Sequence, residues 1–503
     1  MSGTVTTAAR RVLLLAIEAH RDDPATTRAL HAQLARLDEP LRVAIAGKVK
    51  AGKSTLLNAL VGEQVAPTDA GECTRVVTWY RDGPSPRITV LRKDAPPTAL
   101  PVRRRDGALV IDLGDVPAER VDRLTVDWPS QSLRVATLID TPGIASATAE
   151  NSRRTVAFLD PDDDAPTEAD AVIYLMRHLH AADAQFLESF RDRGVARAGA
   201  VHTIAVISRA DEIGGGRVDA MFAARGIAQR YRADPTVRGL CQNVVAVAGL
   251  IAETGRTLRQ TEFAAMAALA AEPKADLESQ LRSVDRFLRG PDPAGRRQLL
   301  HRFGIFGVRL STSLIRQGAS SPAALATELV ARSGLGELQR VLQTQFMQRR
   351  DLLKARSALL AVDSMLRSTQ RGAALRHDIE RILAGAHELA ELRLLATLRS
   401  GQVELPKGAA AEAERLLGDA GASAACRLGS ADDATPDQLR QDAFAALDRW
   451  QRHVVNPMFS RNTVDACRVV VRSCEGIVAA LPAPGAGHRP ASGGVHRPAG
   501  TRG

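Results

Sequence analysis

The stretch LRVAIAGKVKAGKSTLLNAL, residues 41–60, predicts the local fold on which the other inferences from the sequence depend. Its first six residues are typical of a short buried strand, and the run from residue 53 to 62 is typical of a helix. Between them, Gly47, Gly52, Lys53 and Ser54 spell G-x-x-x-x-G-K-S. A strand, a glycine-rich loop and a helix in this order indicate a phosphate-binding loop.

Each part of this loop has a chemical role in holding a nucleotide. The glycines let backbone N–H groups approach the phosphates, Lys53 bridges the β- and γ-phosphates, and Ser54 offers its hydroxyl to Mg²⁺. Three of the chain's seven lysines lie in this loop, so its positive charge is not a by-product of composition. The predicted phosphate-binding residues are Gly47, Lys48, Val49, Lys50, Ala51, Gly52, Lys53, Ser54 and Thr55.

A second candidate element is LIDTPG, residues 138–143. An aspartate at the end of an apolar strand can reach the Mg²⁺ of a bound nucleotide, which makes Asp140 a predicted metal ligand beside Ser54. Gly143 is predicted to present its N–H to the γ-phosphate. The alternative is an ordinary strand-to-turn aspartate, and the phosphate-binding loop earlier in the chain favours the functional interpretation.

The segment APTDAGECTRVVT, residues 66–78, lies between these two motifs. A GTPase needs one threonine in a mobile loop here to complete the Mg²⁺ shell and to sense the γ-phosphate. Thr68, Thr74 and Thr78 compete for this role. Thr74 is the best placed, just before a strand-like run at 75–80, and is the predicted metal ligand and catalytic residue.

The tetrapeptide SRAD, residues 208–211, is the candidate for recognising the base. Asp211 can accept hydrogen bonds from guanine N1–H and N2–H₂, which adenine cannot satisfy. Arg209 can lay its stem across the base, and Ser208 stands where an Asn or Thr is usual. The alternative is a strand-end aspartate that caps a helix. Ala248 and Gly249, which end the next apolar run, are predicted to complete the contact with the base of GTP.

The remaining sequence predicts an α/β domain followed by helices. Runs rich in apolar and β-branched residues alternate with helix-length stretches, which is typical of a mainly parallel sheet with helices on both faces. These runs are 75–80, 87–92, 123–128, 132–140, 171–176, 202–208 and 243–249. After about residue 255 the pattern is helical, and residues 335–366 predict one long amphipathic helix.

This pattern divides the chain into four segments. Two helices are expected within residues 1–40, a P-loop GTPase domain over 41–335, and a helical bundle over 336–481. The tail, 482–503, is rich in proline and glycine and is predicted to be disordered.

The composition limits the partners and the compartment. A net charge of +10 and a pI near 9.9 indicate an anionic partner, either nucleic acid or an acidic lipid surface. The five cysteines form no C-x-x-C pair, which favours reduced thiols in a cytosolic protein over disulfides or a metal site. No signal peptide and no membrane-spanning stretch is expected, so any contact with a membrane is peripheral.

The four motifs in this order resemble those of bacterial dynamin-like GTPases, in particular the isoniazid-inducible dynamin-like proteins of mycobacteria. The nucleotide motifs are shared by many GTPases, and the stretches after residue 256 make the resemblance specific. The residues that carry it are 47–84, 140–143, 208–217, 256–266, 303–318 and 332–359.

The resemblance implies a GTPase head with a long helical stalk to which the N-terminal helices return. It implies hydrolysis of GTP with Mg²⁺, and pairing of heads that reshapes or tethers membranes from their cytoplasmic face. The implied partners are acidic lipids, a second copy of the chain and a paralogous dynamin-like protein. Three tyrosines and three tryptophans offer little for stacking on RNA, so nucleic acid is not the expected partner.

The loop departs from the family pattern at two positions. Val49 and Lys50 stand where relatives carry a polar residue that handles water or a monovalent cation, and Ile144 rather than Gln follows DTPG. Catalysis would then rest on Lys53, Thr74, Mg²⁺ and backbone dipoles, with slow intrinsic turnover. Lys50 is a candidate to replace the monovalent cation or to reach a partner's nucleotide; a solvated lysine beside a polyanion is the alternative.

Two breaks between helices are candidate membrane contacts. They are residues 398–408, with Val403, Leu405 and Lys407, and the arginine-bearing turn at 365–376. Ordinary interhelical loops are the alternative for each. For the whole chain, the rival functions are an RNA- or ribosome-associated assembly GTPase and a regulatory GTP switch.

Overall fold

The computed structural model describes residues 3–68, 76–92, 95–105, 107–114, 116–143, 168–177, 202–367, 372–406 and 408–482. Thr74, Ile144, Lys407 and the tail from 483 lie outside these ranges, as does the middle of the 365–376 turn. The chain forms two compact units, residues 1–402 and residues 403–503.

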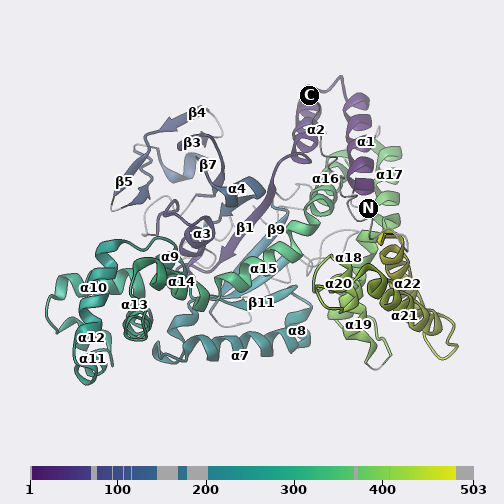
Figure 1. The fold of residues 1–503 in the computed structure, drawn as a ribbon. Helices are drawn as coiled ribbons and strands as arrows, with labels where there is room; N and C mark the ends of the chain where they lie inside the picture. Colours follow the sequence, from purple (N-terminus) through teal and green to yellow (C-terminus); the bar gives the residue numbers. More distant parts are fainter. Residues whose placement is uncertain are drawn as a thin grey trace, which may run out of the picture. The chain divides into compact units, whose positions relative to one another are not determined.

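Nine strands of the described residues form one sheet in the first unit (Figure 1). Its order is β11-β10-β9-β1-β8-β2-β7-β3-β4. The strands are β1 Leu41–Gly47, β2 Thr78–Asp82, β3 Arg87–Arg92, β4 Ala95–Leu100, β7 Val121–Trp128, β8 Ala136–Asp140, β9 Ala171–Met176, β10 Thr203–Ile207 and β11 Asn243–Ala246. A separate hairpin pairs β5 Arg103–Arg105 with β6 Ala108–Val110.

The sheet is parallel from β11 to β8 and mixed beyond it. β1 pairs in parallel with β8 on one side and β9 on the other, and β10 continues the series to β11. β2 then runs antiparallel to β8 and parallel to β7, while β3 is antiparallel to both of its neighbours. The predicted fold class, a mainly parallel sheet with a long helical region, is therefore confirmed.

Successive side chains of a strand point to opposite faces of the sheet, and in this sheet the side chains on both faces are buried. Ala44 and Ala46 of β1 belong to one buried cluster, whereas Val43 and Ile45 belong to another. The first cluster includes residues of α7 (Ala220–Ala233) and α9 (Gly249–Arg256), and the second includes residues of α3 (Lys53–Val61) and α15 (Leu335–Gln345). Helices on both faces explain why these strands are apolar runs without alternation.

The predicted strand over 132–140 is wrong in its first half. Residues Gln131–Val135 form the short helix α4, in which Leu133 is buried, and the strand β8 begins only at Ala136. Ala136 is also where the pairing with Leu41 of β1 begins. The residues before it pair with no strand among the described residues, and the helical turn buries Leu133 while Val135 is 46% exposed.

One short helix precedes the last strand, and a group of helices follows it. They are α8 Pro235–Arg238 before β11 and, after it, α9, α10 Gln260–Ala271, α11 Lys274–Gln280, α12 Val284–Leu288, α13 Pro293–Arg316 and α14 Pro322–Arg332. α13 is kinked at Gly304, whose φ of +64° and ψ of 171° interrupt the helix. Met266, Phe287 and Phe303 of this group are buried in the same cluster as α7.

The single helix predicted over 335–366 is wrong, because the chain breaks after residue 345. α15 is followed by a 3₁₀ turn at Met347–Arg349 and then by α16, Arg350–Leu366. Leu338 and Phe346 are buried against the sheet, whereas Leu352 and Leu359 are buried in a third cluster with the N-terminal helices. The break lies where the chain passes from the core against the sheet to the core with the N-terminal helices, although Leu353 of α16 still belongs to the first of these cores.

The N-terminal helices pack against residues that lie more than three hundred positions later. α1 (Gly3–Ala19) and α2 (Pro24–Arg36) contact α16, and α1 also contacts α17 (Ala373–Gly385), as Figure 1 shows. Leu13 and Leu30 are fully buried there. Asp23 caps α2 by accepting a hydrogen bond from Ala25 N at 3.0 Å, and Pro24 occupies the first turn. α18, His387–Arg399, completes this cluster.

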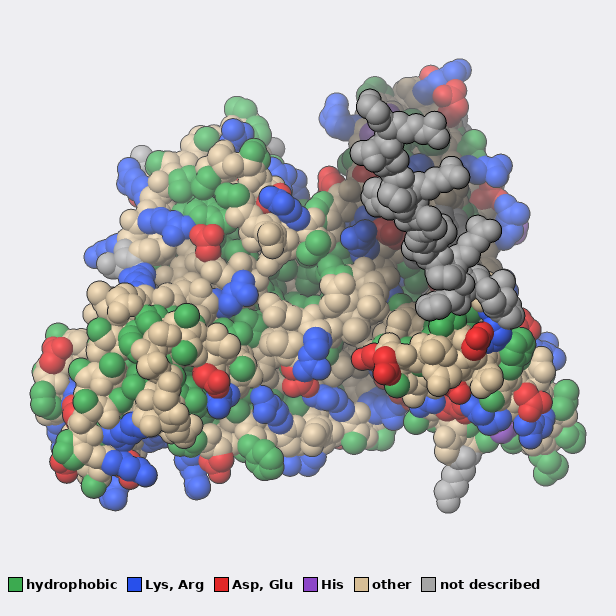
Figure 2. Space-filling model, in the orientation of Figure 1, with side chains coloured by type: hydrophobic (Ala, Val, Ile, Leu, Met, Phe, Trp, Pro, Cys, Tyr) green, Lys and Arg blue, Asp and Glu red, His purple; other side chains and the backbone are tan. Residues whose placement is uncertain are grey.

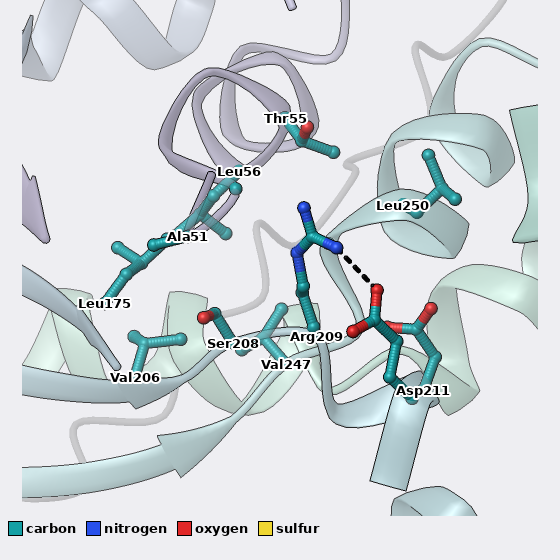
Figure 3. Close-up of a pocket in the computed structure, with 13 residues that line it drawn as sticks. Ala51, Thr55, Leu56, Leu175, Val206, Ser208, Arg209, Asp211, Val247 and Leu250 are labelled. Atoms are coloured by element: carbon teal, nitrogen blue, oxygen red, sulfur yellow. Dashed lines mark hydrogen bonds and ion pairs between the residues drawn. The ribbon is translucent and has the colours of Figure 1, made fainter. Parts of the chain in front are cut away.

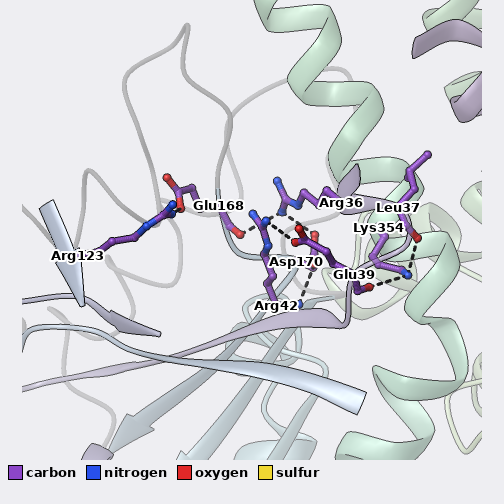
Figure 4. A network of polar contacts seen from close by, with 8 residues as sticks. All are labelled: Arg36, Leu37, Glu39, Arg42, Arg123, Glu168, Asp170 and Lys354. Atoms are coloured by element: carbon purple, nitrogen blue, oxygen red, sulfur yellow. Dashed lines mark hydrogen bonds and ion pairs between the residues drawn. The ribbon is translucent and has the colours of Figure 1, made fainter. Parts of the chain in front are cut away.

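A buried ion pair joins the end of α2 to the sheet (Figure 4). Arg36 Nη2 donates to Asp170 Oδ1 at 2.7 Å, and the two side chains are 2% and 0% exposed. The other carboxylate oxygen of Asp170 accepts from Arg42 N at 2.9 Å, at the start of β1. Nearby, Lys354 Nζ of α16 donates to the carbonyls of Leu37 at 2.8 Å and Glu39 at 3.0 Å. The link between α2 and β1 is therefore held by charged hydrogen bonds from both sides.

The second unit is helical throughout its described residues. It contains α19 Ala409–Leu416, α20 Ala424–Leu428, α21 Pro436–Val454 and α22 Arg461–Ala480. α21 and α22 pack against each other along their lengths (Figure 1). Cys467 and Cys474 are buried there as free thiols, and burial raises the pKa of Cys474 to about 12. Across the described ranges, no helix is both long and apolar enough to span a bilayer.

We predict that Arg36→Ala destabilises the first unit strongly. Removing the guanidinium leaves the Asp170 carboxylate buried without its charged partner, which costs about 3–5 kcal/mol. The free energy of unfolding in urea measures this loss. Arg10→Ala is the matched control, because Arg10 forms an exposed ion pair with Asp38 at 2.6 Å whose loss costs about 1 kcal/mol or less. Equal losses in the two variants would contradict the role given to the buried pair.

Candidate nucleotide-binding site

The site lies at the edge of the sheet where three parallel strands end. β1 pairs Ile45 with Asp140 of β8, and Gly47 with Leu175 of β9. The phosphate-binding loop and the DTPG segment therefore leave the sheet at the same edge, beside the start of α3. Gly47 has a φ of +145°, and a Cβ there would lie 2.4 Å from the carbonyl oxygen of Leu175. Only glycine fits where the loop leaves β1.

Lys53, Ser54 and Asp140 meet at this edge. Ser54 Oγ donates to Asp140 Oδ2 at 2.8 Å, and Lys53 Nζ donates to the carbonyls of Gly47 and Lys48, each at 3.3 Å. Burial raises the pKa of Asp140, while the charge of Lys53 and the hydrogen bond from Ser54 oppose that rise. Burial also lowers the pKa of Lys53, and the charge of Asp140 opposes this. Both side chains are held in a region that disfavours their charged forms.

One oxygen of this cluster lacks a partner. Asp140 Oδ1 is buried, and within the described residues it has no hydrogen bond. Together with the Ser54 hydroxyl it offers two hard oxygen ligands, which is the donor type that Mg²⁺ prefers. Mg²⁺ usually takes one or two protein ligands and fills its other positions with phosphate and water. The residues present therefore fit Mg²⁺ held jointly with a nucleotide.

The middle of the loop is the part that departs from the usual pattern. Val49 lies against Gly143: a Cβ at Gly143 would be 2.5 Å from Val49 Cγ2. The Val49 side chain is nevertheless 45% exposed. Lys50 is exposed and has a φ of +60°, a left-handed conformation that is uncommon outside glycine. The loop thus presents Lys50 outward on a strained residue, while Ala51 is buried and Gly52, with a φ of +94°, precedes α3.

The three candidate threonines have different positions. Thr74 lies outside the described residues, so its role as metal ligand stays a prediction. Thr78 is buried in β2, directly opposite Asp140 in the neighbouring strand, and its hydroxyl donates to the carbonyl of Val76 at 3.3 Å. Thr68 is exposed at the end of the described part of the loop.

A pocket beside the loop collects the residues predicted to bind the base (Figure 3). It encloses about 570 Å³ of empty space, including its open mouth. Ala51, Gly52 and Thr55 line it from the loop and α3. Further along the chain, Ser208, Arg209, Asp211 and Gly249 line it from the segments that follow β10 and β11. Residues from three separate predicted motifs therefore share one pocket.

Asp211 is set up as a hydrogen-bond acceptor. It is 7% exposed, at the start of a 3₁₀ segment, Ala210–Gly215, directly after β10. Burial raises the pKa of Asp211 to about 6, so the carboxylate is charged at neutral pH in an environment that poorly solvates it. Ser208, another residue of the pocket, is held by its backbone, because its N–H donates to the carbonyl of Met176 at 2.8 Å.

Ala248 lies behind the pocket rather than in its wall. It is fully buried, and its N–H donates to the carbonyl of Ser333 at 2.9 Å. Gly249, the next residue, begins α9 and lines the pocket. Of the two predicted backbone contacts, the structure brings only Gly249 to the cavity.

Several residues that line the pocket were not predicted from the sequence. The most informative is Glu212, whose carboxylate accepts from Arg209 at 2.6 Å and lies 3.7 Å from the guanidinium of Arg177. An arginine and a glutamate three positions apart are an ion-pair signal that was available in the sequence. The apolar lining residues carry no such signal; they are Leu56, Leu175, Val206, Val247 and Leu250.

Comparison with known proteins agrees with this geometry. The Dynamin family pattern matches residues 43–109. The isoniazid-induced protein IniC of Mycobacterium tuberculosis is 44% identical over 484 residues, covering 93% of this chain and 97% of that protein. A bacterial dynamin-like protein of Nostoc punctiforme is 33% identical over 125 residues, which is 22% of this chain and 18% of that protein.

Among solved structures, one is described as an oligomerised bacterial dynamin pair that provides a mechanism for long-range sensing and tethering of membranes. It superposes with a TM-score of 0.31 and 14% identity, covering 80% of this chain and 75% of that one. The similarity to IniC extends over nearly the whole of both chains. This chain therefore belongs to the IniC family of bacterial dynamin-like GTPases.

Proposed function

We propose that this chain hydrolyses GTP to GDP and phosphate, and that pairing of its heads couples hydrolysis to membrane binding and to remodelling or repair. The observation that carries the proposal is the cluster of Lys53, Ser54 and Asp140 at the edge of the sheet. It holds one ammonium, one hydroxyl and a carboxylate oxygen with no hydrogen bond to any described residue, next to a pocket that presents Asp211. This is the set of groups that a phosphoanhydride and a guanine require.

In this proposal the residues of the loop position the triphosphate. Lys53 would leave the carbonyls of Gly47 and Lys48 and place its charge between the β- and γ-phosphates. Ser54 and Asp140 would hold Mg²⁺, together with Thr74. Bound Mg²⁺ would neutralise phosphate charge as the bond to the leaving oxygen breaks. Gly143, in contact with the loop at Val49, would donate its N–H to the γ-phosphate.

The site offers few side chains that could position the attacking water. Val49 offers it no polar group, and Ile144 replaces the glutamine that would position it in other GTPases. We therefore propose that isolated chains turn over slowly, and that a second head adds the missing groups. Lys50, which is exposed and charged, is the residue of the loop that we propose meets such a partner.

For the membrane step we propose peripheral binding to acidic lipids on the cytoplasmic face of the plasma membrane. The net charge of +10 supports an anionic partner. Self-association of heads and a paralogous dynamin-like protein are the proposed protein partners. Binding of RNA without binding of lipid vesicles would replace this proposal by an RNA-associated assembly GTPase, and binding of neither by a regulatory switch.

We predict that Lys53→Ala and Asp140→Asn each lower GTP turnover by at least about a hundredfold, because the first removes the positive charge proposed to lie between the phosphates and the second removes a charged ligand proposed for Mg²⁺. Release of phosphate with saturating Mg²⁺ measures this. Lys274→Ala is the control, since Lys274 is an exposed lysine in α11 that pairs with Glu278 at 3.8 Å and does not line the described pocket. Wild-type turnover in Lys53→Ala would disprove the proposed site.

We predict that GTP affinity falls about tenfold per pH unit below the pKa of Asp211, about 6. Only the charged carboxylate can accept hydrogen bonds from both guanine N1–H and N2–H₂. GTP affinity is therefore greatest above this pH, and below it the binding of a proton to Asp211 competes with the binding of GTP. Fluorescence titration with a labelled GTP analogue from pH 4.5 to 8 measures the profile.

The Asp211→Asn variant provides the control for this profile. Its pH dependence should retain only the titration of the nucleotide phosphates, so the difference between the two profiles belongs to the carboxyl group. The variant should also prefer xanthosine to guanosine triphosphate by at least about a hundredfold relative to the wild type, because an amide can donate to the xanthine carbonyl. Unchanged base preference would exclude Asp211 as the base reader.

We predict that Lys50→Ala lowers GTP turnover and that added K⁺ restores part of it. The cation would occupy the position proposed for the ammonium near the phosphates. Turnover in KCl and in choline chloride at equal ionic strength measures the effect. Equal rates for wild type and variant in both salts would make Lys50 a solvated side chain.

A further inference from the structure

Glu253 is a buried carboxylate of α9 that the proposed chemistry does not use. Charged side chains of both signs are interspersed over the outer surface of the neighbouring helices α10 to α13 (Figure 2). Glu253 is instead 3% exposed, and burial raises its pKa. Its Oε1 accepts from Gln64 Nε2 at 2.9 Å and from Asn58 Nδ2 at 3.3 Å. A carboxylate is costly to bury, so its position between two amides from much earlier in the chain calls for an explanation.

Asn58 of α3 holds residues 64–66, which we call the root of the 66–78 segment. Its Oδ1 accepts from Val65 N at 3.0 Å and from Ala66 N at 2.7 Å, and its Nδ2 donates to the carbonyl of Ala66 at 2.9 Å. Asn58, Val65 and Ala66 are each at most 1% exposed. Buried backbone groups without partners cost stability, so this one side chain fixes the backbone where the chain enters the segment.

Gln64 connects the root to further elements. Its carbonyl accepts from Leu109 N of β6 at 2.9 Å. Its side-chain oxygen accepts from Arg259 Nη2 at 3.5 Å, directly before α10, while its side-chain nitrogen donates to Glu253. The root is therefore held by α3, by α9, by the start of α10 and by the β5–β6 hairpin.

This buried cluster lies one helical turn behind both parts of the candidate site. Asn58 is four residues after Ser54 in α3. Glu253 is four residues after Gly249 in α9. Residues four apart share a face of a helix, and α3 and α9 pack against each other (Figure 1). The cluster thus connects the helix that follows the phosphate-binding loop, the helix that starts at the base pocket, and the 66–78 segment.

We propose that Asn58 and Glu253 are positioning residues for GTP hydrolysis, which fix the root so that Thr74 meets the Mg²⁺ and the γ-phosphate. They act through that threonine and touch neither the nucleotide nor the metal. A segment whose root is fixed loses less conformational freedom when it closes on a ligand, which favours the arrangement in which the phosphate is transferred. This inference rests on the proposed GTPase function and names residues that prepare its site.

The test compares steady-state turnover of GTP by the full chain, at varied GTP and Mg²⁺, with binding of a fluorescent GDP analogue. Asn58→Ala and Glu253→Ala should each lower kcat at least about tenfold and raise the Mg²⁺ concentration needed for half-maximal turnover, because Thr74 is no longer held in place. Affinity for the GDP analogue should stay within about threefold of the wild type, since GDP has no γ-phosphate for the segment to contact.

Two further variants separate positioning from charge and from folding. The amide oxygen of Glu253→Gln can still accept from both Asn58 and Gln64, so its turnover and Mg²⁺ dependence should stay within about twofold of the wild type. Gln64→Ala keeps the test decisive if the other alanine variants fail to fold, because Gln64 is partly exposed. It should lower kcat at least about threefold and leave binding of the GDP analogue unchanged.

Arg296→Ala is the matched control for loss of a buried polar side chain. Arg296 is 3% exposed in α13, and it donates to the carbonyl of Phe287 and to Glu272, each at 3.0 Å. These bonds join the helices from α10 to α13, and Arg296 does not line the described pocket. The variant should lose thermal stability while keeping the kcat and the Mg²⁺ dependence of the wild type.

The outcomes separate this inference from the function on which it rests. Wild-type kcat and Mg²⁺ dependence in Asn58→Ala and Glu253→Ala, or in Gln64→Ala where those two do not fold, would overturn the positioning role. Equal losses of kcat in Glu253→Ala and Arg296→Ala, or in Glu253→Ala and Glu253→Gln, would overturn it too, as would loss of GDP-analogue binding in parallel with kcat. A wild-type chain that binds the GDP analogue but hydrolyses no GTP would overturn the proposed function itself.

Discussion

The parallel pairing of β1 with β8 and β9 is the constraint on which the candidate site depends. The register sets Ile45 opposite Asp140 and Gly47 opposite Leu175, so segments that are far apart in the chain end at one edge of the sheet. Parallel strands present their carboxyl ends together, and ligands bind where those ends meet. A shift of one residue would turn Asp140 to the other face of the sheet and separate it from Ser54.

Buried charge gives this edge its chemical character. Lys53 and Asp140 each offset part of the other's cost of burial, but the second oxygen of Asp140 has no hydrogen bond among the described residues. An unsatisfied buried carboxylate oxygen costs stability. The site is therefore organised for a bound ligand and its cation rather than for the greatest stability of the free protein. Asp211 is buried in the same way, and in the proposed function the donors of guanine would compensate for the burial of its carboxylate.

The helices are organised by where their apolar side chains can be buried. Phe346 is buried against the sheet and Leu352 against the N-terminal helices, and the chain breaks between them. Arg36 and Asp170 then connect α2 to the sheet through a buried ion pair, and Lys354 holds the segment that follows α2. Such a pair is costly to break, since the loss of one partner leaves an uncompensated buried charge.

The sequence by itself determined the phosphate-binding loop, the DTPG and SRAD segments, and the helical character after residue 255, because these depend on local patterns of glycine, charge and periodicity. It did not show that residues 131–135 form a helix or that the helix after residue 335 breaks, because strand pairing and the position of two cores decide these points. The lining of the base pocket by Leu175 and Leu250 likewise depends on contacts between distant segments. Tertiary structure decides which of many similar apolar residues are covered, since local sequence carries no record of what packs against it.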